Sequence, residues 1–358
     1  MVVLGSTGSI GVNSLLIANK FNIEVEALSC NKNVDLLNLQ IAKFKPKFVC
    51  IGDESLVKSV NHKTVFVGEN GLLKMLENCK SKKIINALVG FAGLKPSIKT
   101  QNLGKTLCLA NKESLVVAGK FLDTKKIIPI DSEHFGLKFL LKNMKISKMI
   151  ITASGGAFRD ASLKSLKNAT PKDALKHPNW NMGAKITIDS ATMSNKLFEI
   201  MEAYHLYGIS KIDAFIERTS TIHALIEFID GSTTAHISNT DMKLSIANAI
   251  LERVEVPILK HFDLLSLQNG LKFEKIDLEK YPVFSLKDEV IKNPDLGVII
   301  NAANEIYVSQ FLNNECKFLD IKKIIFESLN KFSSFRAKNL DEIFEIDKKV
   351  RVFARNLI

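Results

Sequence analysis

The first 131 residues alternate short apolar runs with amphipathic segments. The apolar runs predict strands over residues 2–4, 23–28, 47–51, 65–67, 84–88, 106–110 and 126–130. Residues 9–18 and 34–44 show the periodicity of helices that are apolar on one face. This alternation predicts an α/β fold in which a doubly wound parallel sheet carries helices on both faces. We therefore expect a Rossmann-like N-terminal domain over residues 1–131.

A different pattern follows residue 131. Apolar or alternating runs predict strands over residues 149–153, 185–188, 214–216, 222–229 and 234–237. Asp230-Gly231, between the last two runs, predicts a hairpin. The segment Thr170-Pro171-Lys172-Asp173 has the N-cap, the first-turn proline and the acidic third position of a helix start. These mixed elements predict an α+β catalytic domain over residues 132–255.

The remaining chain is patterned less evenly. Residues 256–290 are loosely patterned and are expected to form a linker between domains. Helical periodicity then returns over residues 299–310, 321–332 and 340–355. We expect a C-terminal helical domain over residues 291–358.

Composition narrows the class of protein. The 358 residues are 46% hydrophobic and 24% charged, as is typical of soluble globular proteins. No apolar run approaches the ~20 residues of a membrane span, and the first residues lack the basic and cleavage regions of a secretory signal. The five cysteines are scattered and include no CxxC pair, which argues against a disulfide framework or a zinc ribbon. We expect a cytoplasmic protein that does not associate with membranes.

The net charge of +11 raises the question of nucleic-acid binding. Only six of the 49 basic residues are Arg, and the lysines are spread along the chain instead of clustering with aromatic residues. We therefore expect anionic small molecules, and not nucleic acid, as partners.

A glycine-rich segment, GSTGSIG at residues 5–11, follows the first predicted strand and opens the first predicted helix. Glycines in this position let the backbone approach a dinucleotide pyrophosphate, which the helix N-terminus attracts. The spacing is GxxGxxG, where GxGxxG is usual, and a plain glycine turn is the alternative. After the second strand, Asn31-Lys32-Asn33 stands where an acidic residue would bind a ribose 2′-hydroxyl. Lys32 favours a 2′-phosphate, so the sequence predicts NADPH.

Polar groups also follow later strands of the first domain. The segment NKES at residues 111–114 is expected to face the cofactor crevice, although a helix cap explains it equally well. Asp131 and Glu133 follow the last strand, and in an extended segment they would point the same way. Together with Glu199 they offer oxygen ligands suited to Mg²⁺ or Mn²⁺. An acidic surface turn is the alternative.

The segment from His177 to Ala203 combines an anion site with carboxylates. We expect a helix to start near residues 190–194, where Ser and Thr hydroxyls would cap it and, with Asn195 and Lys196, bind an anion. Glu199 and Glu202 would share one face of that helix. An ordinary capped surface helix is the alternative. The segment TASGGAFR at residues 152–159 is similar to a phosphate cradle, or else forms a plain turn.

Together these motifs resemble one family, the 1-deoxy-D-xylulose 5-phosphate reductoisomerases. They are GSTGSIG (5–11), LANKESLV (109–116), IPIDSEH (128–134), TASGGAFR (152–159), the stretch from TPKDALK to TMSNK (170–196) and NAANEIYVSQFL (301–312). The resemblance implies an enzyme that binds NADPH and Mn²⁺ or Mg²⁺. Such an enzyme rearranges and reduces a keto-sugar phosphate to 2-C-methyl-D-erythritol 4-phosphate, in the methylerythritol phosphate route to isoprenoid precursors. The resemblance also implies a homodimer.

The resemblance further implies roles for individual residues. The cofactor site would consist of Thr7, Gly8, Ser9, Ile10, Asn31, Lys32, Asn33, Asn111, Glu113 and Gly183. The substrate site would consist of Lys112, Ser132, Glu133, Ser154, His177, Trp180, Ser190, Asn195, Lys196 and Glu199. The metal ligands would be Asp131, Glu133 and Glu199, and the candidate catalytic groups are Lys112, Glu133 and Glu202. Residues 154–184 resemble a mobile lid whose Trp180, the only Trp in the chain, closes over the substrate.

The chain departs from the family pattern at a few positions. Leu197 is bulkier than its counterpart, Lys243 replaces an Arg, and the segment ERTS at residues 217–220 replaces His-Pro-Gln-Ser. These positions concern packing around the site.

Two other functions fit part of the pattern. A different NADP-dependent dehydrogenase would need a nucleophilic Cys near a His, and a binding protein without catalysis would have lost the carboxylates.

Overall fold

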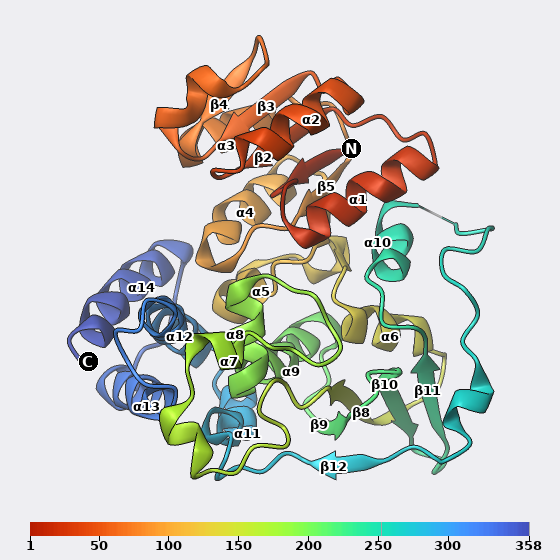
Figure 1. Ribbon diagram of the computed structural model, residues 1–358, viewed down its shortest axis with the longest axis vertical. Helices are drawn as coiled ribbons and strands as arrows, with labels where there is room; N and C mark the ends of the chain where they lie inside the picture. Colours follow the sequence, from red (N-terminus) through yellow and green to blue (C-terminus); the bar gives the residue numbers. More distant parts are fainter. Residues whose placement is uncertain (252, 358) are drawn as a thin grey trace. The chain divides into compact units, whose positions relative to one another are not determined.

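The computed structural model describes residues 1–251 and 253–357 (Figure 1). Contacts within the chain divide it into two compact units. Unit 1 comprises Met1–Ser114, Leu122–Asp131 and Asp241–Leu259, and unit 2 comprises Leu115–Phe121, Ser132–Thr240 and Lys260–Ile358. The domain boundaries expected from the sequence stay a prediction. In the described part of the chain, no helix has both the length and the apolar character needed to cross a bilayer.

Unit 1 contains a seven-stranded parallel sheet in the order β4-β3-β2-β1-β5-β6-β7. Its strands are β1 Val2–Leu4, β2 Ala27–Cys30, β3 Phe48–Ile51, β4 Val65–Val67, β5 Lys83–Asn86, β6 Thr106–Leu109 and β7 Ile127–Pro129. Its helices include α1 Ser9–Lys20, α2 Val34–Phe44, α3 Gly68–Asn78, α4 Leu94–Asn102 and α10 Lys243–Ile250. The strand order changes direction between β1 and β5, and ligands bind at the carboxyl ends of strands at such a point. The expected doubly wound sheet is confirmed.

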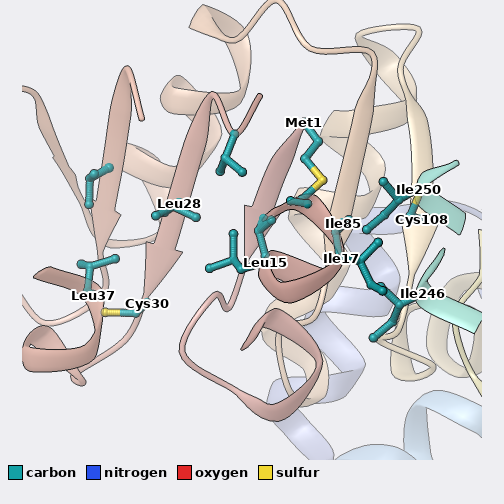
Figure 2. Close-up of a cluster of buried hydrophobic side chains, with 14 of the residues drawn as sticks. Met1, Leu15, Ile17, Leu28, Cys30, Leu37, Ile85, Cys108, Ile246 and Ile250 are labelled. Atoms are coloured by element: carbon teal, nitrogen blue, oxygen red, sulfur yellow. The ribbon is translucent and has the colours of Figure 1, made fainter. Parts of the chain in front are cut away.

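Apolar burial explains why a helix from late in the chain belongs to unit 1. Leu15 and Ile17 of α1 lie in one core cluster with Leu28 of β2, and Ile246 and Ile250 of α10 lie in the same cluster (Figure 2). Each such side chain contributes about 1.5–3 kcal/mol when it is fully buried. This burial holds α10 against α1.

Unit 2 contains a five-stranded mixed sheet in the order β11-β10-β8-β9-β12. Its strands are β8 Ile146–Ala153, β9 Ile212–Glu217, β10 Ile222–Phe228, β11 Thr233–Ile237 and β12 Phe273–Lys275. β8 and β9 are parallel, and the other pairs are antiparallel. The hairpin expected at Asp230-Gly231 is confirmed, because β10 pairs with β11 and Gly231 has a φ of 89°.

The helices of unit 2 include α6 Ser132–Leu140, α7 Pro171–Ala174, α8 Ala184–Thr192, α9 Ser194–Tyr207, α11 Lys287–Lys292, α12 Leu296–Leu312, α13 Asp320–Phe332 and α14 Leu340–Arg355. Of these, α6 and α9 pack against this sheet, and α12, α13 and α14 pack on one another in the C-terminal region. The helix start expected at Thr170 is confirmed, with both bonds of a capping box between Thr170 and Asp173. Part of the predicted linker is ordered, because β12 pairs with β9 and Val283 is completely buried.

Two local expectations are wrong. Residues 185–188 belong to α8 and not to a strand, because Ile188, Ala191 and Thr192 fall on one buried helical face. Polar and apolar residues alternate over 185–188 and three of them are β-branched, a pattern that is typical of a strand. The helix expected near residues 190–194 begins at Ser194, but its N-cap is Met193 at a φ of 62°, with no side-chain capping bond. The expected hydroxyl cap is therefore wrong as well.

Candidate active site

The glycine-rich loop connects β1 to α1, and its backbone requires glycine. Gly5 has a φ of +78°, and a Cβ there would lie 2.7 Å from the Ala87 carbonyl oxygen. A Cβ at Gly11 would lie 2.3 Å from the Gly5 carbonyl oxygen. Gly8 is the N-cap of α1 and offers no side-chain cap, and the first turn contains no acidic residue. The first N–H groups of a helix lack intrahelical partners. This loop can therefore bind an anion.

The segment expected at the 2′-phosphate follows β2. Lys32 is 72% exposed, and its Nζ lies 3.9 Å from Asp53 Oδ2. Asn33 Oδ1 accepts a hydrogen bond from Leu36 N at 3.2 Å and so caps α2. Lys32 is the charged residue of this segment, and its exposed side chain can contact an anionic ligand.

Asn111 and Lys112 follow β6 and make contrasting contacts. Asn111 is 1% exposed, and its Oδ1 accepts from Ser114 N at 3.1 Å, so it acts as a helix cap at the start of α5 (Glu113–Ala118). Lys112 Nζ donates to Asp131 Oδ2 at 2.7 Å, and both side chains are largely buried. Asn111 therefore caps the helix while Lys112 contacts a predicted metal ligand, so the segment can be both a helix cap and part of the site.

Three carboxylates from distant parts of the sequence meet. The expected extended conformation of residues 131–133 is wrong, because α6 begins at Ser132 and Glu133 lies in its first turn. Ligand oxygens of Asp131, Glu133 and Glu199 nevertheless lie within 4.8 Å of one another. Carboxylates this close repel one another unless cations compensate their charge. A set made only of carboxylate oxygens fits Mg²⁺ or Mn²⁺.

Lys196 supplies part of this compensation. It is 4% exposed, and its Nζ lies 3.1 Å from Glu133 Oε1 and 2.5 Å from Glu199 Oε2. The same Nζ donates to the Thr152 carbonyl oxygen at 2.5 Å. Asn195 Nδ2 donates to Glu199 Oε1 at 2.5 Å. Asn195 and Lys196, which were expected to bind an anion, therefore contact predicted metal ligands in this structure.

The sequence interpretation assigned no role to His134, although it follows Glu133 directly. Its Nε2 lies 2.9 Å from Glu202 Oε2, and both side chains are almost completely buried. The sequence did contain a signal for a role of His134, because it stands beside Asp131 and Glu133. Glu202, predicted as a candidate catalytic group, therefore has a buried histidine as a partner.

Ser154 and His177 form an oriented pair. His177 Nδ1 accepts from Asn179 N at 3.2 Å and from Trp180 N at 2.9 Å. The proton of a neutral ring must then be on Nε2, which donates to Ser154 Oγ at 2.8 Å. Burial, with Arg159 and Lys196 nearby, lowers the pKa of His177 to about 4. Because Ser154 Oγ accepts here and from Gly156 N at 3.2 Å, its own hydroxyl proton is directed elsewhere.

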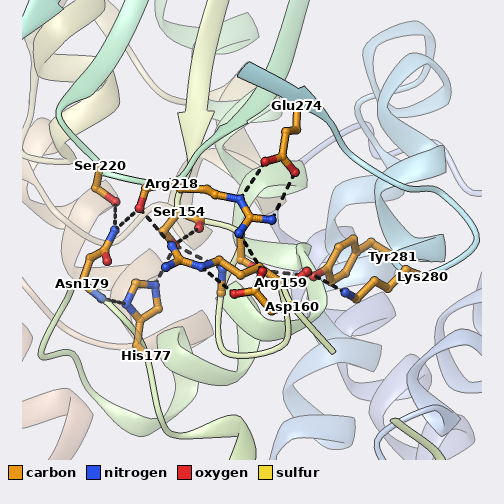
Figure 3. A network of polar contacts seen from close by, with 12 residues as sticks. Ser154, Arg159, Asp160, His177, Asn179, Arg218, Ser220, Glu274, Lys280 and Tyr281 are labelled. Atoms are coloured by element: carbon orange, nitrogen blue, oxygen red, sulfur yellow. Dashed lines mark hydrogen bonds and ion pairs between the residues drawn. The ribbon is translucent and has the colours of Figure 1, made fainter. Parts of the chain in front are cut away.

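Both ends of the predicted lid converge on Arg218 (Figure 3). The Arg218 carbonyl oxygen accepts from Arg159 Nη1 at 2.9 Å and from Asn179 Nδ2 at 2.8 Å. The Arg218 guanidinium also contacts Asp160 at 2.6 Å and Glu274 at 2.7 Å. This network lies in the segment that departs from the family pattern, and it was missed because its partners are far apart in sequence.

The remaining predicted residues lie near the same segments of unit 2. Trp180 contacts His223 edge to face, with 6.2 Å between ring centroids. A Cβ at Gly156 would lie 2.6 Å from the Ser190 carbonyl oxygen, so the glycine turn packs against α8. Gly183 is the N-cap of α8 and belongs to unit 2, unlike the other predicted cofactor residues. Ser132 Oγ donates to Glu133 Oε2 at 2.7 Å.

Comparisons with known proteins agree with this geometry. Residues 1–119 match the 1-deoxy-D-xylulose 5-phosphate reductoisomerase family, and residues 127–207 and 237–353 match two C-terminal domains of that family. Reductoisomerases of Campylobacter hominis and Campylobacter curvus are 66% and 62% identical to the chain. Each covers 99% of it, with 99% and 98% of their own lengths matched.

Solved structures are also similar. A DOX-P reductoisomerase in complex with NADPH, fosmidomycin and magnesium has a TM-score of 0.93 at 33% identity, over 99% of this chain and 97% of that one. The Zymomonas mobilis reductoisomerase in complex with NADPH has a TM-score of 0.88 at 34% identity, over 99% and 98%.

Fold and site define an α/β enzyme of the dinucleotide-binding class with three carboxylates that could hold a metal ion. The chain belongs to the 1-deoxy-D-xylulose 5-phosphate reductoisomerase family. The roles of the individual site residues stay predictions.

Proposed function

We propose that the chain catalyses the NADPH- and divalent-metal-dependent rearrangement and reduction of 1-deoxy-D-xylulose 5-phosphate to 2-C-methyl-D-erythritol 4-phosphate. This is a step in the methylerythritol phosphate route to isoprenoid precursors. The observation that carries the proposal is the meeting of Asp131, Glu133 and Glu199 within 4.8 Å. It occurs in a chain that is 66% identical to a named reductoisomerase.

The three carboxylates would hold Mn²⁺ or Mg²⁺. A divalent cation in such a site supplies Lewis acidity and lowers the cost of negative charge that develops on carbonyl and hydroxyl oxygens. Lys112 contacts Asp131 at 2.7 Å and Lys196 contacts Glu133 at 3.1 Å, and these ion pairs would orient the carboxylates. Lys112 would stabilise an oxygen of the substrate, and Glu133 would accept or return a proton.

The nucleotide would bind at the loop of residues 5–11, whose glycines let the backbone approach a pyrophosphate. Lys32 would face the 2′-phosphate. NADPH held there would supply the hydride that reduces the aldehyde formed by the rearrangement.

The phosphate of the substrate would bind near Ser154. His177 orients the Ser154 hydroxyl by donating to it, so its proton can bond to a phosphate oxygen. Energy from binding this non-reacting group serves to orient the reacting end. Arg159, Asn179 and the Arg218 carbonyl would hold the lid that covers it and excludes water.

The assembly and location of the enzyme are part of the proposal. We propose a homodimer, which is supported by an apolar groove on the unit 2 sheet that includes Ile150, Phe215, Leu225 and Phe273. We propose a cytoplasmic enzyme, because the scattered cysteines fit a reducing compartment. Analytical ultracentrifugation tests the first statement, and fractionation of cells tests the second.

The decisive experiment is an assay of NADPH oxidation with 1-deoxy-D-xylulose 5-phosphate, with and without Mn²⁺. We expect turnover only when the metal is present. Absence of turnover under both conditions, in protein that is shown to be folded, would reject the proposed reaction.

A further inference from the structure

Gln40, on the buried face of α2, fixes the glycine-rich loop. Its side-chain amide bonds twice to a single residue of that loop. Nε2 donates to the Ser6 carbonyl oxygen at 2.8 Å, and Oε1 accepts from Ser6 Oγ at 2.7 Å. Gln40 is 6% exposed and Ser6 is completely buried. A hydrogen-bonded pair this well buried cannot exchange its partners for water without a large cost.

A second residue completes the attachment of Ser6. The Ser6 N–H donates to the Ser29 carbonyl oxygen at 2.8 Å, and the Gly5 N–H donates to Ser29 Oγ at 3.1 Å. The backbone N–H, the carbonyl and the hydroxyl of Ser6 are therefore all bonded to residues outside the loop. The following turn therefore starts from a fixed residue, and it is closed by the Gly8 N–H, which donates to the Gly5 carbonyl oxygen at 3.1 Å.

We propose that Gln40 is a positioning residue for the dinucleotide. By holding Ser6 from both its hydroxyl and its carbonyl, Gln40 keeps the following backbone N–H groups aimed at the pyrophosphate before the cofactor arrives. A loop that is ordered in advance loses less entropy on binding and binds more tightly. This inference rests on the proposed NADPH site and adds a residue that does not itself touch the cofactor.

The chemistry requires an amide at this position. An apolar side chain of similar volume would leave the Ser6 hydroxyl and carbonyl buried without these partners. Glutamate could accept from Ser6 Oγ but could not donate to the carbonyl, and it would place a negative charge near an anion site. Glutamine satisfies both groups and stays neutral.

The test compares two variants of α2 in the full chain. Gln40→Met removes both bonds to Ser6 and keeps the volume. Asn38→Leu is the matched control, because the Asn38 amide also makes two bonds, to Ser59 O and from Asn61 N, each at 2.8 Å, to a different loop. We expect the Kd for NADPH, measured by cofactor fluorescence, to rise about tenfold in Gln40→Met. We expect it to stay unchanged in Asn38→Leu, and the KM for the sugar phosphate to stay unchanged in both.

The possible results distinguish failure of the Gln40 role from failure of the proposed NADPH site. An unchanged Kd in Gln40→Met, or an equal rise in Asn38→Leu, would overturn the positioning role. If Gln40→Met does not fold, Ser6→Ala removes only the hydroxyl bond, and an unchanged Kd in that variant would overturn the role in the same way. Failure of the unmodified chain to bind NADPH would instead overturn the cofactor assignment, and this inference with it.

Discussion

His134 Nε2 lies 2.9 Å from Glu202 Oε2, and the two side chains are 0% and 1% exposed. The contact joins α6 to α9 one residue after Glu133 and one helical turn after Glu199. The Tyr207 hydroxyl adds a bond of 2.6 Å to the His134 carbonyl oxygen. The two helices that supply carboxylates to the candidate metal site are therefore also bonded to each other, which favours a positioning role for Glu202 over proton transfer.

Substitution of Glu202 distinguishes these roles. Glu202→Ala removes the buried carboxylate that contacts His134 Nε2 and should lower the free energy of unfolding by about 1–3 kcal/mol. Glu202→Gln keeps the size of the side chain and an oxygen at this contact, and should keep turnover within about tenfold of the unmodified chain. Urea unfolding and steady-state kinetics measure the two effects. A loss of kcat far beyond this range in a stable Glu202→Gln variant would point to proton transfer.

Glu199→Gln should abolish metal-dependent turnover while NADPH still binds. The loss should exceed the about 10–100-fold that is typical of residues that only support metal ligands. The glycine-rich loop belongs to unit 1 and Glu199 belongs to unit 2, so cofactor fluorescence should be unchanged. Mn²⁺ titration of turnover is the measurement, with Glu345→Gln on the exposed face of α14 as a control. Normal Mn²⁺ dependence in Glu199→Gln would remove Glu199 from the ligand set.

His177 should make stability depend on pH. Burial and the charges of Arg159 and Lys196 lower its pKa from 6.5 to about 4. In this interval the unfolded chain binds a proton that the folded chain does not. The stabilisation is therefore complete above pH 6.5 and is lost as the pH falls to about 4. The difference in unfolding free energy between the unmodified chain and His177→Gln should shrink on acidification, and a constant difference would contradict the lowered pKa.

Gly156→Ala should destabilise the turn that carries Ser154. Gly156 has a φ of +67°, and an added Cβ would lie 2.6 Å from the Ser190 carbonyl oxygen. Strain of this kind costs about 1–3 kcal/mol. Gly183→Ala is the control, because its Cβ would meet nothing within 4 Å. Thermal unfolding should separate the two variants, and equal melting temperatures would argue against the close packing of this turn on α8.

Asn179→Ala should weaken closure of the lid more than Arg218→Ala does. Asn179 Nδ2 donates to the Arg218 carbonyl oxygen at 2.8 Å and to Ser220 Oγ at 2.6 Å, and both bonds are partly buried. The Arg218 guanidinium makes exposed ion pairs, which contribute little. We expect a higher KM for the sugar phosphate in Asn179→Ala. Because Trp180 is the only Trp, its fluorescence should change when a substrate analogue binds; a silent signal would contradict closure over this residue.

Local signals in the sequence predicted most elements of the fold. Apolar runs gave the strands of unit 1, and the glycine spacing placed a loop after β1 whose backbone requires glycine at Gly5. The capping box at Thr170 and the hairpin at Asp230-Gly231 were also predicted, because each depends on interactions between near neighbours. Residues 185–188 were misassigned because their period of two is local, whereas the burial that makes them helical comes from other parts of unit 2.

By itself the sequence determined which residues could carry the chemistry, since residue type and spacing decide which groups can bind a nucleotide or a metal. Only the tertiary structure decided which of them meet. Lys196 reaches Glu133 across 63 residues of sequence, and Gln40 reaches Ser6 across 34. Periodicity specifies the face of an element that is buried, but the partner of that face depends on how all elements pack together.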